Sequence, residues 1–164
     1  MHTVIIIPAR YASTRYMGKP LAMLSLPDGS QKSLIEMTWE AAGQVSGIDA
    51  VFIATDDERI SQTSKAFGAE VIMTSETCHN GTERCAEVVG KLDKAPDILV
   101  NVQGDEPLIP HEVLRAVLEP FQKEAPAPMS TVATRFRSLE DTEALLTDPI
   151  RVRREYLRQF KAHQ

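Results

Sequence analysis

Short runs of hydrophobic residues alternate along the chain with stretches of helical periodicity. The runs predicted to form buried strands are residues 4–8, 50–54, 71–73, 98–102 and 129–134. Continuous apolar strands separated by helices are typical of a parallel sheet that is covered on both faces. The pattern therefore predicts an α/β fold with a mostly parallel sheet.

Helical spacing of apolar residues predicts the segments between these strands. The predicted helices run through residues 33–45, 60–67, 85–92 and 113–121. Ser33 and Glu36 fit a capping box at the start of the first helix, and Gly68 is placed to stop the second. Thr82 is a candidate cap for the third helix, which would bury Cys85 and Val88 on one face.

Polar segments follow three of the predicted strands, at residues 9–20, 55–57 and 103–107. Ligands bind at the carboxyl ends of the strands in such sheets, so these segments are the candidate site. The first contains Arg10, Arg15 and Lys19, which can bind phosphate oxygens through their side chains. It is not a Walker A loop, because Ser13 and Pro20 replace the required Gly and Ser or Thr. The alternative is that these cations simply lie on the surface.

The segment after the 98–102 strand contains a candidate metal ligand. Asp105 is held between Gly104 and a nearby proline, and Mg²⁺ binds one or two carboxylates together with substrate phosphates. The alternative is an acid at the start of a helix on a surface loop. Gln103 would point into the same crevice, where it can hydrogen-bond a base or a sugar hydroxyl.

Composition and charge favour a single globular domain with a basic end. The chain has 164 residues, of which 43% are hydrophobic and 25% charged. The first 150 residues carry 13 basic and 22 acidic groups, whereas residues 151–164 carry five basic and one acidic. We therefore predict a nucleotide-binding α/β domain over 1–150 and a basic helical tail over 151–164. The acidic body argues against nucleic-acid binding, although a tail that binds RNA or DNA is a weaker alternative.

The sequence gives no sign of a membrane or secreted protein. It contains no apolar run of 18 residues, and its first residues lack the basic region of a signal peptide. Cys78 and Cys85 are too few for a disulfide framework and fit no zinc motif, so we expect reduced, structural cysteines. A cytoplasmic location is expected.

Four segments together resemble one known family. Residues 8–21 read Pro-Ala-Arg-Tyr-Ala-Ser-Thr-Arg-Tyr-Met-Gly-Lys-Pro-Leu, and residues 54–56 read Ala-Thr-Asp. Residues 79–87 read His-Asn-Gly-Thr-Glu-Arg-Cys-Ala-Glu, and residues 101–107 read Asn-Val-Gln-Gly-Asp-Glu-Pro. In order and spacing they resemble the 3-deoxy-manno-octulosonate (Kdo) cytidylyltransferases, or CMP-Kdo synthetases.

The resemblance implies a Rossmann-like fold of the nucleotide-diphospho-sugar transferase type and the reaction CTP + Kdo → CMP-Kdo + pyrophosphate. It further implies dependence on Mg²⁺, a homodimer, and a cytoplasmic step of lipopolysaccharide biosynthesis. The catalytic role would fall on three cations and one acid, namely Arg10, Arg15, Lys19 and Asp105. Nucleotide binding would involve residues from several loops, namely Ala9, Arg10, Ser13, Arg15, Lys19, Met73, Thr74 and Gln103. Asp105 would also ligate the metal.

The resemblance ends shortly after residue 149, so we expect a C-terminally truncated or frame-shifted member of the family. Segments that supply sugar contacts and a second metal-binding Asp in the family are not found in this sequence. A non-catalytic CTP-binding fragment is therefore an alternative. An acylneuraminate-type cytidylyltransferase is another, although that group usually has a Gly-Ser-Lys element where this chain has residues 12–15.

Overall fold

The computed structural model describes residues 1–12, 16–123, 125 and 127–132. It divides into two compact units, Met1–Ser130 and Thr131–Gln164. The first unit contains nearly all of the described residues, and the fold below is that of this unit. The strand predicted at 129–134 is not found in its described part, residues 129–132. Residues 133–134 and the predicted tail at 151–164 lie outside the described residues.

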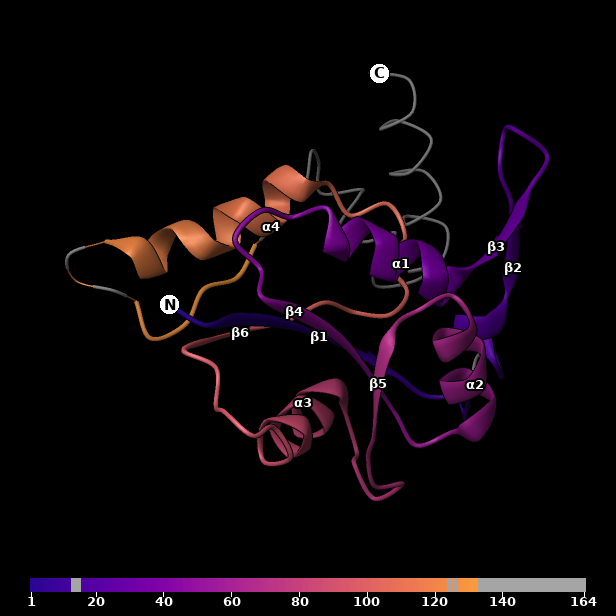
Figure 1. Ribbon diagram of the computed structural model, residues 1–164, viewed down its shortest axis with the longest axis horizontal. Helices are drawn as coiled ribbons and strands as arrows, with labels where there is room; N and C mark the ends of the chain where they lie inside the picture. Colours follow the sequence, from indigo (N-terminus) through magenta and orange to yellow (C-terminus); the bar gives the residue numbers. More distant parts are fainter. Residues whose placement is uncertain (13–15, 124, 126, 133–164) are drawn as a thin grey trace, which may run out of the picture. The chain divides into compact units, whose positions relative to one another are not determined.

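A four-stranded parallel sheet forms the centre of the unit (Figure 1). Its strands, in spatial order, are β5 (Glu70–Met73), β4 (Ala50–Thr55), β1 (Thr3–Ala9) and β6 (Ile98–Asn101). Every pairing is parallel. The four strands predicted in this part of the chain and their parallel arrangement are thus confirmed.

Helices cover both faces of the sheet, as the continuous apolar strands require. In Figure 1, α1 (Leu34–Gly43) and α4 (His111–Leu118) lie above the sheet and α3 (Gly81–Val89) lies below it. Alternate residues of the central strand β1 point into the two layers. Ile5 and Ile7 belong to the larger core, which also includes residues of α1, α4 and α2 (Glu58–Ala66). Val4 and Ile6 pack with Cys85 and Val88 of α3 in a second core.

Local signals define the helix ends, although helix bounds and one cap differ from the prediction. The Ser33 hydroxyl accepts a hydrogen bond of 3.3 Å from the Glu36 amide, as the capping box requires, although α1 ends at Gly43 and does not reach Val45. In α3 the cap is Asn80, whose side chain accepts from the Glu83 amide at 2.9 Å. The assignment of Thr82 as the cap was wrong, because the helix already begins at Gly81.

A small antiparallel hairpin and two 3₁₀ turns were not predicted. The hairpin joins β2 (Met23–Ser25) to β3 (Gln31–Ser33). Its strands are short and largely exposed, so they lack the apolar runs that reveal the central sheet. An Asp-Gly pair at residues 28–29 was the available signal for a hairpin turn. The turns are η1 (Lys19–Leu21) and η2 (Glu119–Gln122), which extends α4.

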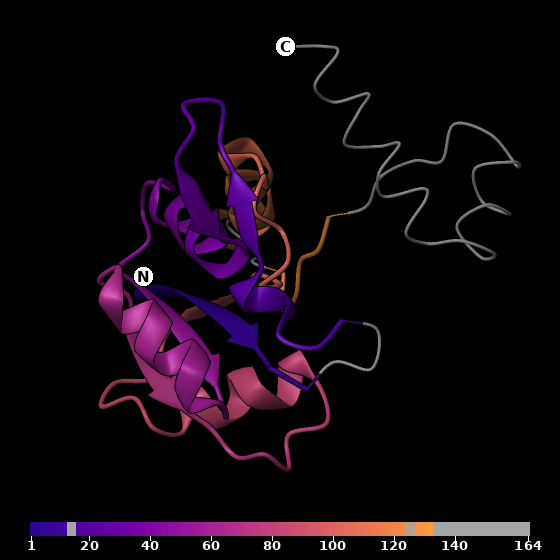
Figure 2. The same cartoon turned by 90° about the vertical axis from the view of Figure 1, so that its right-hand side faces the viewer.

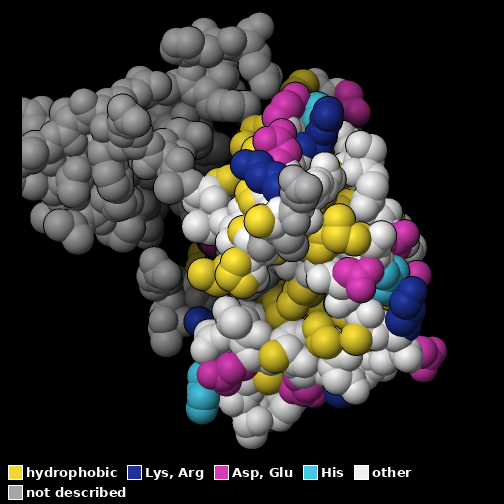
Figure 3. Space-filling view, turned by 90° about the vertical axis from the view of Figure 1, so that its left-hand side faces the viewer, with side chains coloured by type: hydrophobic (Ala, Val, Ile, Leu, Met, Phe, Trp, Pro, Cys, Tyr) yellow, Lys and Arg dark blue, Asp and Glu magenta, His cyan; other side chains and the backbone are white. Residues whose placement is uncertain are grey.

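The surface on the side of the N-terminus carries charges of both signs around exposed hydrophobic atoms (Figure 3). This side of the molecule holds the amino ends of the strands, away from the candidate site. Among the residues that the structure describes, no helix has the length and hydrophobicity needed to cross a membrane.

Candidate functional site

The polar segments that follow β1, β4, β5 and β6 lie at one edge of the sheet, where the four parallel strands end. Figure 2 looks onto this edge, with the β2–β3 hairpin above the sheet and α3 below it. Because all four strands are parallel, the ends of segments far apart in the sequence meet here.

Lys19 and Asp105 are in direct contact at this edge. The Lys19 Nζ atom donates a hydrogen bond to Asp105 Oδ2 at 2.5 Å, and the two residues are 86 positions apart in the sequence. Their side chains remain 40% and 30% exposed, so both are within reach of a ligand. The loop after β1 and the loop after β6 therefore meet at this edge of the sheet.

The ends of the loop after β1 are held together by Tyr11 and Gly18. The Gly18 amide donates to the Tyr11 carbonyl at 2.9 Å, and Gly18 has a left-handed φ of 68°. A side chain at Gly18 would lie 2.8 Å from the Tyr11 ring, so only glycine fits. The Arg59 guanidinium stacks on the same ring, with its Cζ atom 3.3 Å from the ring centre. This anchoring places Lys19, which follows Gly18 directly.

The loop after β6 is positioned by a close approach of Gly104 to β1. A Cβ atom at Gly104 would lie 3.0 Å from the Pro8 carbonyl oxygen and 3.3 Å from Ile35 Cδ1. The buried Thr38 hydroxyl, which donates to the Leu34 carbonyl at 3.0 Å, also lies 3.4 Å from the Gly104 carbonyl oxygen. The absence of a side chain at Gly104 thus allows the neighbouring Asp105 to lie beside the end of β1.

The other predicted site residues fall into three groups. Ala9 is the buried last residue of β1, and Arg10, directly after it, is exposed at the same edge. Gln103 is exposed and donates from Nε2 to the Asn101 side chain at 3.1 Å. Ser13 and Arg15 lie outside the described residues, so their predicted roles stay predictions.

The donor chemistry of the site fits a magnesium ion bound mainly through its substrate. Within the described ranges, no cluster of three or more His, Cys, Asp or Glu side chains is placed to hold a metal ion. Mg²⁺ is commonly bound by one or two carboxylates while phosphates and water complete its octahedron. Asp105, with Glu106 beside it, provides such carboxylates next to the cationic loop.

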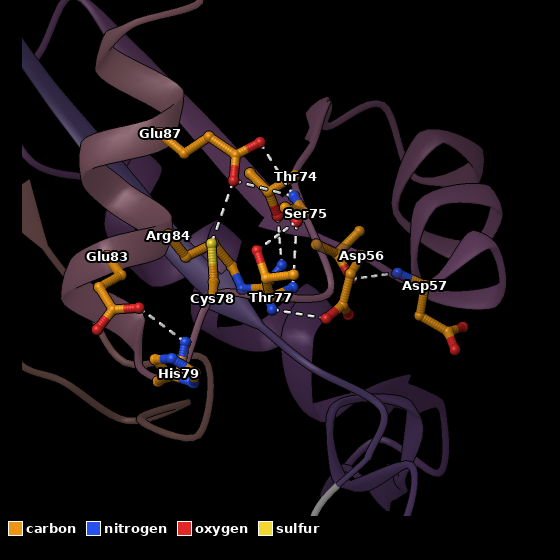
Figure 4. A network of polar contacts seen from close by, with 11 residues as sticks. Asp56, Asp57, Thr74, Ser75, Thr77, Cys78, His79, Glu83, Arg84 and Glu87 are labelled. Atoms are coloured by element: carbon orange, nitrogen blue, oxygen red, sulfur yellow. Dashed lines mark hydrogen bonds and ion pairs between the residues drawn. The ribbon is translucent and has the colours of Figure 1, made fainter.

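A second polar cluster lies at the ends of β4 and β5, and sequence reasoning assigned no role to the arginine at its centre (Figure 4). Arg84 of α3 is 3% exposed, and its guanidinium donates to Asp56 Oδ2 at 2.7 Å and to the Thr74 hydroxyl. Asp56 follows β4 and Thr74 follows β5. A charged residue four positions before the buried Val88 on an apolar helix face was the signal for a buried arginine.

Met73 and Thr74, predicted to bind the nucleotide, are held in place by several contacts. The Thr74 amide donates to the Thr55 carbonyl at 2.8 Å, which continues the ladder between β4 and β5. The Met73 carbonyl accepts from Lys91 Nζ at 2.6 Å. Thr74 is buried, whereas Met73 is 38% exposed.

Glu87 organises the segment that follows Thr74. Its carboxylate accepts from the Ser75 amide at 3.0 Å and from the Cys78 thiol at 3.1 Å, and it pairs with Lys91 at 2.7 Å. The contact with Lys91, followed by those with Ser75 and Cys78, lowers the pKa of Glu87 to about 2. Glu87 is therefore ionised at neutral pH.

Both cysteines are free thiols, as expected from the sequence. Burial raises the pKa of Cys85 to about 11, and the hydrogen bond to Glu87 raises the pKa of Cys78. A thiol with a raised pKa is a poor nucleophile, since the thiolate is the reactive form. Neither cysteine is suited to covalent catalysis.

The fold and the site define an α/β protein with a ligand-binding edge at the carboxyl ends of its strands. Known structures share this architecture. The chain is similar to a solved CMP:2-keto-3-deoxy-manno-octonic acid synthetase complexed with CTP, with 41% identity and a TM-score of 0.68. That match covers 76% of this chain and 48% of the solved one. The fold is thus that of the nucleotidyltransferase class.

Sequence comparison defines the family. A profile described as "Cytidylyltransferase" matches residues 4–154, so the chain belongs to the cytidylyltransferase family. The 3-deoxy-manno-octulosonate cytidylyltransferase of Pasteurella multocida is 53% identical over 120 residues, which cover 73% of this chain and 44% of that protein. The Arabidopsis thaliana protein named "3-deoxy-manno-octulosonate cytidylyltransferase, mitochondrial" is 47% identical over 148 residues. This match covers 90% of the chain and 48% of the plant protein, so the chain spans about half the length of the relatives it matches.

Proposed function

We propose that this chain binds CTP with Mg²⁺ and takes part in the activation of Kdo to CMP-Kdo. The contact between Lys19 and Asp105 carries the proposal, because it brings a cation and a carboxylate from two strand ends to one place. The similar protein of known structure is complexed with CTP, which supports the same ligand here. The names of the relatives support Kdo as the acceptor.

The chemistry proposed for the site is alignment and charge neutralisation. The anomeric hydroxyl of the sugar would attack the α-phosphorus of CTP, pyrophosphate would leave, and the hydroxyl proton would pass to solvent or a base. Arg10 and Lys19 would bind the triphosphate, together with the predicted contacts of Ser13 and Arg15. Gln103 would hydrogen-bond the base or a sugar hydroxyl, and Ala9 would contact the base through its backbone. When bound through Asp105, Mg²⁺ would neutralise developing charge on the phosphate oxygens.

A CTP-binding module without transferase activity is the second candidate. The matches cover about half of each relative, so the other half of those proteins is not aligned with this chain. The proposed CTP site depends only on segments within residues 9–106. Binding and turnover can therefore be separated experimentally.

The test is a calorimetric titration with CTP and Mg²⁺ alongside an assay of pyrophosphate release in the presence of Kdo. Binding with release supports the transferase, and binding without release supports the module. Replacing Kdo with N-acetylneuraminate in the same assay tests the acylneuraminate alternative. A chain that binds no CTP at any Mg²⁺ concentration contradicts both candidates.

The remaining proposals concern organisation and setting. We propose that the nucleotide-binding domain extends over residues 1–150 with 151–164 as a basic tail, and limited proteolysis followed by mass mapping tests this boundary. The homodimer is tested by sedimentation velocity, and the cytoplasmic location by cell fractionation. An interaction of the tail with RNA or DNA would be salt-sensitive and lost on deletion of residues 151–164.

A further inference from the structure

We propose that Arg84 is a positioning residue that sets the base preference of the nucleotide site. The inference rests on the proposed function, because it concerns how the same site selects its base. It is supported by the buried Arg84 guanidinium, which donates to one acceptor after β4 and to another after β5.

The burial of Arg84 separates it from the cations proposed to bind phosphate. Its side chain is 3% exposed, whereas Arg10 is exposed and the Lys19 side chain is 40% exposed. A buried charge must be paired and hydrogen-bonded, and here Asp56 neutralises it. The pair is therefore suited to a neutral part of a ligand and not to a phosphate.

The spacing between the Arg84 cluster and the Lys19–Asp105 contact is similar to the distance between the base and the triphosphate of a nucleotide. Lys19 and Asp105 lie at the ends of β1 and β6, whereas Arg84 acts at the ends of β4 and β5. Strand β5 lies two strand spacings from β1, which is roughly 10 Å. A triphosphate held at β1 and β6 would place its base towards Met73 and Thr74.

Side chains of α3 and of Lys91, two residues beyond its end, hold three consecutive residues at the end of β5. Arg84 binds the Thr74 hydroxyl, Glu87 binds the Ser75 amide, and Lys91 binds the Met73 carbonyl. Arg84 and Glu87 are three residues apart, which places them on one face of the helix, and Lys91 extends this face from the turn that follows. This face fixes both the backbone and the hydroxyl that a base would meet, with Arg84 as the member that also reaches β4.

An arginine is required because its two terminal nitrogens donate to different acceptors, one after β4 and one after β5. The planar guanidinium presents its N–H groups in a fixed fork, whereas a lysine at the same place has one nitrogen on a flexible chain. Arg84→Lys would therefore keep the charge next to Asp56 but lose the simultaneous contact with Thr74. Thr74→Val removes the same contact from the other side and leaves the Arg84–Asp56 pair intact.

The experiment measures dissociation constants for CTP, UTP and inorganic triphosphate, each with Mg²⁺, on the full chain and the two variants. We expect the wild-type chain to prefer CTP over UTP, and this preference to fall about tenfold in both variants. Affinity for inorganic triphosphate should change less than about twofold, because it has no base to be positioned. Thr77→Val, an exposed neighbour in the same segment, is the matched control and should retain the CTP preference.

A merely structural role would weaken all three ligands equally, and this result would overturn the inference. Unchanged CTP preference in Thr74→Val would also overturn it, and that variant decides the question if Arg84→Lys does not fold. A wild-type chain that binds CTP and UTP equally would overturn the inference while leaving CTP binding in place. Absence of CTP binding by the wild-type chain would instead contradict the proposed function itself.

Discussion

The ion pair between Lys19 and Asp105 contributes little to the stability of the fold, and we propose that its two groups serve ligand binding. Both side chains are partly exposed, and exposed ion pairs contribute only about 0–1 kcal/mol to stability. Because both side chains are partly exposed, we propose that Lys19 can turn to a phosphate and Asp105 to a metal ion. The pair shows that two loops far apart in the sequence lie side by side in the fold.

Gly104 is predicted to be required for the position of Asp105. In Gly104→Ala, the new Cβ would lie 3.0 Å from the Pro8 carbonyl oxygen, so the backbone must move. We expect a loss of about 1–3 kcal/mol in the free energy of unfolding, together with weaker CTP binding. Urea unfolding and calorimetry measure the two effects.

Gly43→Ala is the matched control for this substitution. Nothing lies within 4 Å of a Cβ atom built at Gly43, the last residue of α1. Alanine in a helix is more stable than glycine by about 0.5–1 kcal/mol, so this variant should be neutral or slightly stabilised. Equal stability of the two variants would contradict the close approach at Gly104.

Among single residues, the neighbourhood of exposed charges was easier to predict than the contacts of buried ones. Lys19 and Asp105 follow two predicted parallel strands, and the alternation of strands and helices already indicates that such strand ends lie together. Arg84 was not assigned a role, because its partners Asp56 and Thr74 come from other elements and their approach depends on the packing of α3. A charge on an apolar helix face signals burial but does not identify the acceptor.

At the scale of elements, the cap of α3 discriminates between two neighbouring polar residues. Asn80→Ala removes the hydrogen bond to the Glu83 amide and should lower the free energy of unfolding by about 0.5–2 kcal/mol. Thr82→Ala, at the second residue of α3, leaves the cap unchanged and should alter the free energy of unfolding by less than about 0.5 kcal/mol. Thermal or urea unfolding of both variants measures this difference. A larger loss in Thr82→Ala would reverse the assignment.

The contacts of Glu87 predict a pH dependence of the segment that follows β5. The folded chain lowers the pKa of Glu87 from 4.5 to about 2, first through Lys91. A lowered pKa stabilises the folded state above the unfolded value, so this contribution is present above pH 4.5 and is lost as the pH falls towards about 2. In Glu87→Gln, the decline of stability over this range should be shallower.

Urea unfolding at successive pH values between about 5 and 2 measures the effect. Glu76→Gln, an exposed acid in the same segment, controls for the loss of one negative charge. If the wild-type chain and Glu87→Gln lose stability in parallel over the whole range, the Glu87 contacts do not stabilise the fold.

Elements with strong apolar patterns were predicted, and those without them were not. The strands β1, β4, β5 and β6 are recognisable because both faces of the sheet are covered. The hairpin of β2 and β3 lies mostly exposed, so its residues carry no alternating hydrophobic pattern. Its Asp-Gly turn was a local signal that the search for apolar runs did not use.

At the scale of the whole molecule, the first unit contains all the segments of the proposed nucleotide site. The cationic loop, the carboxylate loop and the end of β5 all belong to Met1–Ser130. The relatives are about twice as long as this chain, so turnover and sugar binding are separate questions from nucleotide binding. The affinity for CTP therefore tests the proposed site without depending on turnover or sugar binding.

The most direct test is a calorimetric titration with CTP in the presence and absence of Mg²⁺, on the wild-type chain and on Asp105→Asn. If the loops after β1 and β6 form one magnesium-dependent site, Mg²⁺ should raise the CTP affinity of the wild-type chain by about tenfold or more. Asp105→Asn should lose most of this increase while retaining metal-free binding through the cations. An equal gain from Mg²⁺ in both proteins, or no CTP binding by the wild-type chain, would contradict the account.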